Sequence, residues 1–538
     1  MKKHNTSKVV LITILVFLLL TWILPAAYYS GEYVDQGRVQ MGLFDLFNYP
    51  LTALSYFGYI ALFVILVGGF YGILYKIPAY RTFLDKIVEK FKRKEKIALS
   101  IMVIVIALLV SICGVQFGIA IFIPFVVSLI LLMGYDKVVA ALVTVGSIAV
   151  GLIGTTYSYA NNSVLTQTLS LENDFQIGVR FVILLVGIVL VIFNTLMYIK
   201  KTASNVKIEK KTVKKVEEVK EEKVSEPVRK TSAKKTATKS SGKSNSKKKS
   251  NSKTTKSSKS RKSDNKAALK DEDIIVVRES LTDDSDLIPS VVESKHKVWP
   301  FVITFSLLFI LFVLAFVTWG EGGFGVTVFD NVTKSVQEFE LFGFPIFGAL
   351  LGTVNSFGNW AITDMFVPMA IVVILLMIIY RVSFNEACDG FVKGAKKALG
   401  PAAMVILLYT VLVLVTYHPF QMVIYKAVLG LSKGFNIATT AIVAILAGFF
   451  NSDIAYTYQS VVPYYASVVT NVENYSVSAI IFQAMYGLTM LVAPTSLILM
   501  ATLSYLKVNY VEWLKSIWKL LLELFIVLLI IFIILALI

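Results

Sequence analysis

The stretch AILAGFFNSDIAYTYQS, residues 444–460, decides how this chain is interpreted. It places three polar residues, Asn451, Ser452 and Asp453, inside a region that is otherwise apolar enough for a lipid bilayer. A carboxylate near the bilayer centre costs about 2.5–3.5 kcal/mol on insertion scales. A polar triplet at that depth predicts either a site that faces a wet cavity or a polar kink satisfied within a helix bundle.

The composition is that of a membrane protein. The chain has 538 residues, 56% of them hydrophobic, and a mean hydropathy of +0.72. Runs of about eighteen or more nearly uncharged residues predict membrane spans; they include 9–27, 181–199, 298–319 and 517–538. The runs are apolar on both faces, whereas the strands of a membrane barrel would alternate. We therefore predict an all-α polytopic membrane protein, and its two cysteines indicate no disulfide framework.

Basic residues predict the orientation, because Lys and Arg gather on the cytoplasmic side. Lys2, Lys3 and Lys8 place the N-terminus inside, and the basic stretch 76–96 reads as an amphipathic helix on the inner interface. The first apolar run resembles a signal peptide, but its length near twenty residues favours an uncleaved helix.

Each half of the chain contains a long apolar hairpin followed by a broken helix. In the N-terminal half, 1–199, the hairpin covers about 97–134 and the interrupted helix about 138–169. In the C-terminal half, 298–538, the hairpin covers about 435–470 and the interrupted helix about 477–505. Thr156 follows Pro124 by 32 residues, and Thr495 follows Pro463 by the same 32. We predict two inverted repeats, each with a re-entrant hairpin and an interrupted transmembrane helix, an arrangement typical of secondary transporters.

The two halves are joined by a basic linker, residues 200–297. It contains 28 Lys and Arg against 15 Asp and Glu, and supplies +13 of the chain's net charge of +17. Its Lys/Ser-rich centre has too few apolar residues for a core, so we predict a disordered cytoplasmic segment. A tether that contacts anionic lipid is favoured over specific nucleic-acid binding.

Several stretches carry a family resemblance. LLLTWILPAAYYSGEY (18–33), ILVGGFYGILYKIPAYRTFLDKIVEKFKRKEK (65–96), FGIAIFIPFVVSLILLMGYD (117–136) and APTSLILMATLSYLKVNYVEWLK (493–515) resemble YfcC-type proteins of the ion transporter superfamily. These proteins are related to the C4-dicarboxylate anaerobic carriers, and the resemblance implies elevator-like alternating access. The chain differs from the family pattern at both hairpin tips. No carboxylate follows Phe117-Gly118, and Asn451-Ser452-Asp453 replaces a Pro-Ser-Gly-Ser-Gly run.

The candidate binding residues are oxygen-bearing side chains and breaks in the helices, which suit Na⁺ or a polar substrate. In the first half they are Gly114, Gln116, Gly154, Thr155, Thr156, Asn161 and Asn162. In the second half they are Asn451, Ser452, Asp453, Pro494, Thr495 and Ser496. Asp453 is the acid that we place at a tip. It is predicted to carry a coupling proton, bind Na⁺ or meet a substrate ammonium group, and the alternative is a helix N-cap.

These features predict an ion-coupled (Na⁺ or H⁺) secondary active transporter in the plasma membrane. Its substrate is expected to be a small organic acid, C4-dicarboxylate-like, or an amino acid. The alternatives are a channel, or a membrane scaffold whose lysine-rich segment binds anionic lipid or nucleic acid. The sequence has no P-loop, nucleophile elbow or zinc signature, so we predict no enzyme, no metal site and no cofactor beyond Na⁺ as coupling ion. Expected partners are the small-molecule substrate, membrane lipids and a second copy of the chain, while nucleic acid is disfavoured.

Overall fold

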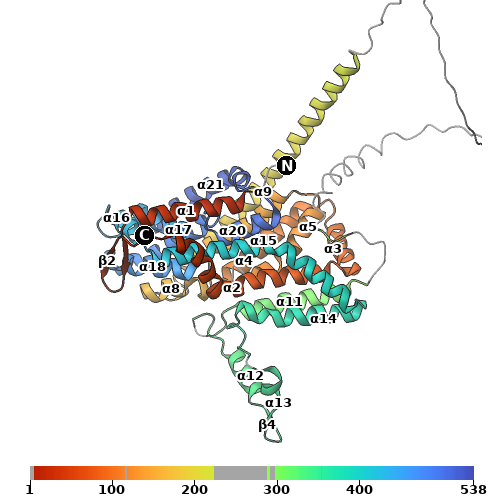
Figure 1. Cartoon of the computed structure of the whole chain (residues 1–538), viewed down its shortest axis with the longest axis horizontal. Coiled ribbons are helices and arrows are strands. Elements are labelled where there is room, and N and C mark those ends of the chain that lie inside the picture. The colour runs from red at the N-terminus through yellow and green to blue at the C-terminus, as the bar shows by residue number, and fades with distance from the viewer. Residues whose placement is uncertain are drawn as a thin grey trace, which may run out of the picture. The chain divides into compact units, whose positions relative to one another are not determined.

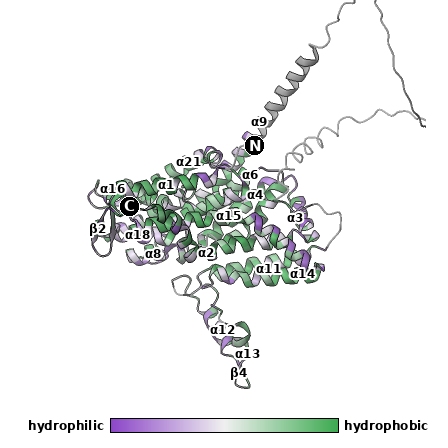
Figure 2. Cartoon of the chain, in the orientation of Figure 1, coloured by the Kyte–Doolittle hydropathy of each residue, from purple (hydrophilic) through white to green (hydrophobic). Residues whose placement is uncertain are grey.

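A computed structural model describes residues 5–114, 118–222, 287–290, 297–320, 322–352 and 354–537. Within these residues, eight helices are long and apolar enough to cross a membrane: Thr6–Ile23, Leu43–Leu74, Glu95–Cys113, Ile177–Thr202, Trp299–Phe316, Ile362–Tyr380, Phe384–Tyr417 and Tyr510–Leu537. Strands are confined there to two short hairpins. The protein is therefore an all-α multi-pass membrane protein, and hydrophobic residues dominate its long helices (Figure 2).

The elements of the N-terminal half follow the order of the chain (Figure 1). They are α1 (Thr6–Ile23), β1 (Ala26–Tyr29), β2 (Tyr33–Gly37), α2 (Leu43–Leu74), α3 (Pro78–Lys90), α4 (Glu95–Cys113), a 3₁₀ turn η1 (Gly118–Ile121), α5 (Ile123–Leu132), α6 (Lys137–Ala141), a π-helical turn η2 (Leu142–Gly146), α7 (Ser147–Ile153), α8 (Tyr159–Leu169) and α9 (Ile177–Glu222).

The C-terminal half begins after the linker. Its elements are α11 (Trp299–Phe316), α12 (Val328–Gln337), β3 (Glu340–Leu341), β4 (Phe344–Pro345), α13 (Ile346–Leu351), η4 (Ile362–Met365), α14 (Phe366–Tyr380), α15 (Phe384–Tyr417), α16 (Gln421–Leu429), α17 (Ile437–Phe450), α18 (Ile454–Val468), η5 (Val472–Asn474), α19 (Tyr475–Thr489), α20 (Leu497–Leu506) and α21 (Tyr510–Leu537). Segment α12–α13 extends away from the other helices and buries none of its residues (Figure 1).

The chain divides into two compact units, 1–199 with 283–538, and 200–282. The second unit begins as a continuation of α9, which runs on to Glu222. The start of the predicted disordered linker, 200–222, is therefore helical, and it is rich in Lys and Glu, which are good helix formers. Residues 223–286 and 291–296 lie outside the described residues.

A close crossing of α2 and α15 organises the first unit. A Cβ atom at Gly72 would lie 2.2 Å from the carbonyl oxygen of Gly390, and one at Gly394 would lie 2.1 Å from that of Gly68. Glycines let the two backbones touch, which is a common way to pack helices in lipid.

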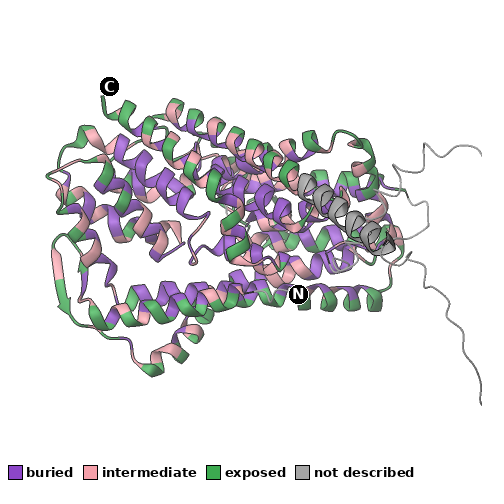
Figure 3. Ribbon diagram, turned by 90° about the horizontal axis from the view of Figure 1, so that it is seen from above, coloured by how far each residue is buried: buried purple, intermediate pink, exposed green. Residues whose placement is uncertain are grey.

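The buried residues gather among the shorter helices. Figure 3 shows that buried residues are concentrated in the interior of the bundle. There α4 packs on α7, α17 on α19, α7 on α19, and α8 on α18. By length α4 is a complete span, with 19 residues, whereas α5, α17 and α18 have 10, 14 and 15. The short helices end inside the bundle and bring the predicted site residues there.

Candidate functional site

The first break separates α7 from α8 at residues 154–158. Gly154 ends α7, and the Ser158 hydroxyl accepts a hydrogen bond from the Asn161 backbone N–H at 3.2 Å to cap α8. Ser111, near the end of α4, donates from Oγ to the Gly154 carbonyl at 2.7 Å and shares a 2.9 Å bond with the Thr156 hydroxyl. The hairpin arm α4 thus satisfies backbone that the break leaves unpaired.

Gly114 brings the hairpin tip against the same break. Its φ of +67° is left-handed, and a Cβ atom there would lie 1.8 Å from Ser158 Oγ. Only glycine allows both the backbone conformation and this close approach. Gln116, at the predicted tip, lies outside the described residues.

The two asparagines of α8 hold the loop between the helices. Asn161 Nδ2 donates to Thr155 Oγ1 at 3.3 Å, and Asn162 Nδ2 donates to the Thr156 carbonyl at 3.4 Å. All four side chains are buried. The residues predicted for the first half are therefore brought together, with the exception of Gln116, which is not described.

A buried arginine binds backbone carbonyls at the first break. Arg180, on the first turn of α9, donates to the carbonyl oxygens of Thr156 and Asn173. Its side chain has no measurable exposure, and its guanidinium lies 4.3 Å from the Phe175 ring centroid. The buried Arg180 guanidinium therefore lies against the backbone of the first break.

The second tip, Asn451-Ser452-Asp453, connects α17 to α18. Asp453 caps α18 by accepting a hydrogen bond from the Tyr456 backbone N–H at 3.0 Å. Asn451 Oδ1 accepts from the Asp453 N–H at 3.0 Å, and the Asn451 carbonyl accepts from the Thr457 hydroxyl at 3.0 Å. The cap considered from sequence exists.

The half-buried Asp453 has further neighbours across the bundle. Tyr59 on α2 and Tyr409 on α15 lie within electrostatic range of its carboxylate. Residues of α2 and α15 are therefore among the electrostatic neighbours of the Asp453 carboxylate.

The second break lies between α19 and α20, beside this tip. Thr495 Oγ1 donates to the Phe449 carbonyl at 2.7 Å, and the Leu497 N–H donates to Ser452 Oγ at 3.3 Å. Ser496 caps α20, and Pro494 lacks the N–H that a continuous helix would need. These residues and the tip form a second cluster.

Helix α19 joins the two clusters. Gln483 Nε2 donates to the carbonyls of Ile153 and Thr155, both at 3.1 Å, while the Tyr486 hydroxyl donates to the Ser452 carbonyl at 2.7 Å. A Cβ atom at Gly487 would lie 2.5 Å from the Ile153 nitrogen, so α19 touches the first break directly. One rigid element thus contacts both breaks.

Several polar atoms around the breaks remain available for a ligand. Asn162 Oδ1, Asn451 Nδ2, Tyr458 OH and Gln483 Oε1 are buried and make no hydrogen bond within the described part of the chain. Buried polar atoms of this kind are expected to be satisfied. Carbonyl, amide and hydroxyl oxygens suit an alkali cation or a polar solute, and no cluster of three or more His, Cys, Asp or Glu that could hold a metal ion occurs among the described residues.

Sequence reasoning missed three members of the site: Ser111, Arg180 and Gln483. Arg180 had a signal, because a lone charge at the head of an apolar run is itself a functional-site indicator. Ser111 and Gln483 look like ordinary small polar substitutions in apolar helices, and only packing shows their role.

Comparison with known proteins supports a family. A family model described as DcuC, C4-dicarboxylate anaerobic carrier, matches residues 55–238 and 283–537. No curated protein and no solved structure matches the chain. The family match includes both breaks, both α19 contacts and most of the α2–α15 crossing.

Proposed function

Because the chain belongs to the C4-dicarboxylate anaerobic carrier family, we propose that it is an ion-coupled secondary carrier of a C4 dicarboxylate. Membership makes it a membrane transporter of the C4-dicarboxylate type with a small-molecule substrate. The observation that carries the proposal is the family match across both broken-helix clusters. A dicarboxylate is favoured over an amino acid on this ground.

The coupling ion is proposed to be Na⁺ or H⁺ and to act at the two breaks. The support is chemical: freed carbonyls, Thr and Asn oxygens, and the Asp453 carboxylate are the groups that bind such ions in broken transport helices. In this proposal α4–α5 and α17–α18 are re-entrant hairpins of two inverted repeats, as in the YfcC-type branch that the sequence resembles.

The proposed location is the plasma membrane, with the N-terminus and residues 200–297 on the cytoplasmic side. The support is the basic charge of 76–96 and of the linker. Lipids and a second copy of the chain are the proposed partners in that membrane.

The test is uptake of radiolabelled succinate into liposomes containing the purified protein, under an imposed Na⁺ or H⁺ gradient. We expect saturable uptake driven by one of the two gradients and absent from protein-free liposomes. Thr495→Ala should lower it, because the hydroxyl that holds α17 at the Phe449 carbonyl is removed. Thr52→Ala is the matched control, since that hydroxyl only bonds the Asn48 carbonyl of its own helix. Absence of succinate and fumarate uptake under both gradients would contradict the proposal.

A further inference from the structure

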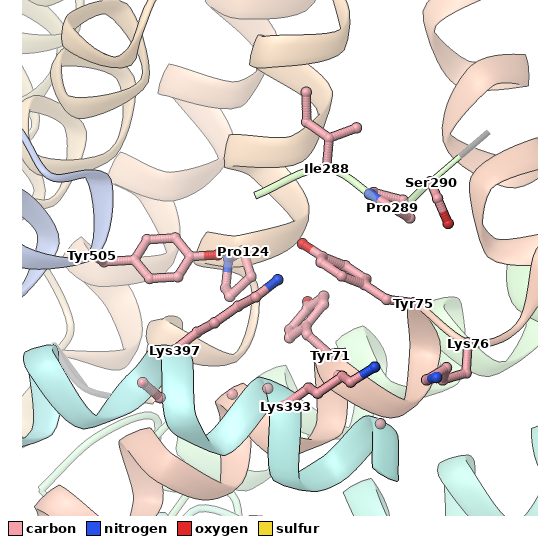
Figure 4. Close-up of a pocket in the computed structure, with 15 residues that line it drawn as sticks. Tyr71, Tyr75, Lys76, Pro124, Ile288, Pro289, Ser290, Lys393, Lys397 and Tyr505 are labelled. Carbon is pink, nitrogen blue, oxygen red and sulfur yellow. The ribbon is translucent and has the colours of Figure 1, made fainter. Parts of the chain in front are cut away.

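A cavity lined by lysines and tyrosines lies away from both breaks, at the end of the first unit that holds α3. Its volume is about 270 Å³, close to the lower end of small-molecule sites, which span roughly 300–1,000 Å³. The walls come from α2, α5, α15, the end of α20 and the short segment 287–290 (Figure 4).

The charge of this cavity has one sign. Lys393 and Lys397 extend from α15, and Lys76 follows the end of α2 (Figure 4). None of the fifteen described residues that line the cavity is acidic. Tyr71, Tyr75 and Tyr505 also line the cavity.

The outer wall is built by the chain itself. The Leu287 carbonyl accepts hydrogen bonds from Tyr75 OH at 3.0 Å and Ser128 Oγ at 2.8 Å, and the Pro289 carbonyl accepts from Arg81 Nη1 at 2.8 Å. Leu287 is buried and Ser290 is exposed. The segment therefore closes one side of the cavity and leaves Ser290 at its mouth.

The cavity also leads toward the breaks. An adjoining apolar cavity of about 90 Å³ shares Gly68, Pro124, Ala398 and Tyr505 with it. The lining of this apolar cavity includes Ala120, which follows the first tip, and Ile498, two residues beyond the Ser496 cap. The charged cavity thus adjoins an apolar one whose lining includes a residue just after the first tip and a residue of α20 just after the second break.

We propose that the lysine-lined cavity is an anion-binding vestibule that takes a small dicarboxylate at the cytoplasmic mouth of the carrier. The inference rests on the proposed function for the identity of the anion. Three ammonium groups with low-dielectric walls concentrate a dianion and raise its encounter rate by roughly 10–10³. The adjoining apolar cavity has no comparable charge to retain the anion, so binding at the mouth precedes passage to the tips.

The experiment measures the local potential at Ser290→Cys in a Cys388→Ser background, with the protein in nanodiscs. Cys113 is buried, and the parent Cys388→Ser protein controls for its reaction. The labelling rates of anionic and cationic methanethiosulfonates are compared, each normalised to its rate with 2-mercaptoethanol. We expect the anionic-to-cationic ratio to exceed that of the free thiol about tenfold. Succinate should slow labelling, while butyrate at equal ionic strength should not.

The double substitution Lys393→Gln/Lys397→Gln should lower the anionic-to-cationic labelling ratio most of the way to the free-thiol value. Lys76→Gln alone should lower it less. The matched control is Lys515→Gln/Lys519→Gln, which removes the same charge from exposed positions on α21 that do not line the cavity. Equal thermal stability of the variants excludes misfolding as the cause.

A ratio equal to that of the free thiol, an equal response to both lysine pairs, or equal protection by butyrate would overturn the inference. The labelling does not depend on transport. If succinate slows labelling but is not taken up into liposomes, the proposed function is contradicted and the vestibule is not. If succinate is taken up but the labelling ratio equals that of the free thiol, the vestibule is contradicted and the proposed function is not.

Discussion

The two breaks use the same kind of backbone interruption but different side-chain chemistry. At the first break, hydroxyls, amides and carbonyls pair with one another, and the charge is the buried Arg180 behind them. At the second break, the charge is the half-buried Asp453, which caps α18 and has Tyr409 of α15 within electrostatic range. Most polar groups of the first break thus bond one another, an arrangement that we call a closed framework. The second break presents a carboxylate to ions.

The largest expected effect comes from Arg180→Ala. The substitution removes the guanidinium donor of the Thr156 and Asn173 carbonyls, leaving Thr156 with the Asn162 amide at 3.4 Å, and hydrogen bonds to charged groups contribute about 1.5–3 kcal/mol each. We expect the midpoint of thermal unfolding in detergent, followed by tryptophan fluorescence, to fall by several degrees. The exposed Arg38→Ala is the control. Equal midpoints for the two variants would show that the first break does not depend on this arginine.

Gly114→Ala tests how tightly the first tip closes on its break. Gly325 is a matched control, because its φ of +69° equals that of Gly114 within two degrees, yet a Cβ atom there would meet no atom within 4 Å. Both variants incur the left-handed strain of about 1–2 kcal/mol. Gly114→Ala should lose about 1–3 kcal/mol more, because its methyl group displaces Ser158.

The measurement is the same thermal unfolding, with succinate uptake as a second readout. A difference near zero between the two alanine variants would mean that the tip moves freely away from α8. The closed framework described for the first break would then be wrong.

The sequence was sufficient for the class of fold and for the location of the polar interruptions. Apolar runs gave the membrane helices, and Gly154, Ser158, Pro494 and Ser496 lie where α7–α8 and α19–α20 separate. These residues act locally, through backbone freedom, a missing N–H or a cap, so their effect is visible in a single chain segment.

The contacts between segments could not be predicted in the same way. Gln483 and Tyr486 are three residues apart on α19, and nothing in their sequence indicates that one contacts Thr155 and the other Ser452. Segment 287–290 is similar, because a Leu-Ile-Pro run in an acidic stretch does not indicate its bonds to Tyr75, Ser128 and Arg81. Long-range pairing depends on where the helices cross, which one sequence does not specify.

Asp453→Asn has the smallest expected effect on stability and separates the two roles of this residue. Asparagine caps helices about as well as aspartate, so the unfolding midpoint should move by no more than the equivalent of a few tenths of a kcal/mol. Uptake of succinate should nevertheless fall sharply or lose its dependence on the ion gradient, since the substitution removes the carboxylate charge at the second tip.

Asp136→Asn provides the matched control for this substitution. Asp136 caps α6 by accepting from the Val139 N–H at 2.8 Å, which is the same role at a helix start outside both breaks, and its other oxygen accepts from the Tyr198 hydroxyl at 3.4 Å. If Asp136→Asn preserves gradient-driven uptake while Asp453→Asn abolishes it, the cap alone does not account for Asp453. If both variants transport normally, Asp453 is a helix cap and the second break is as closed as the first. In that case the coupling ion must bind the carbonyl and amide oxygens near Gln483, such as those of Ile153 and Thr155. The two breaks would then differ in structure but not in their role in transport.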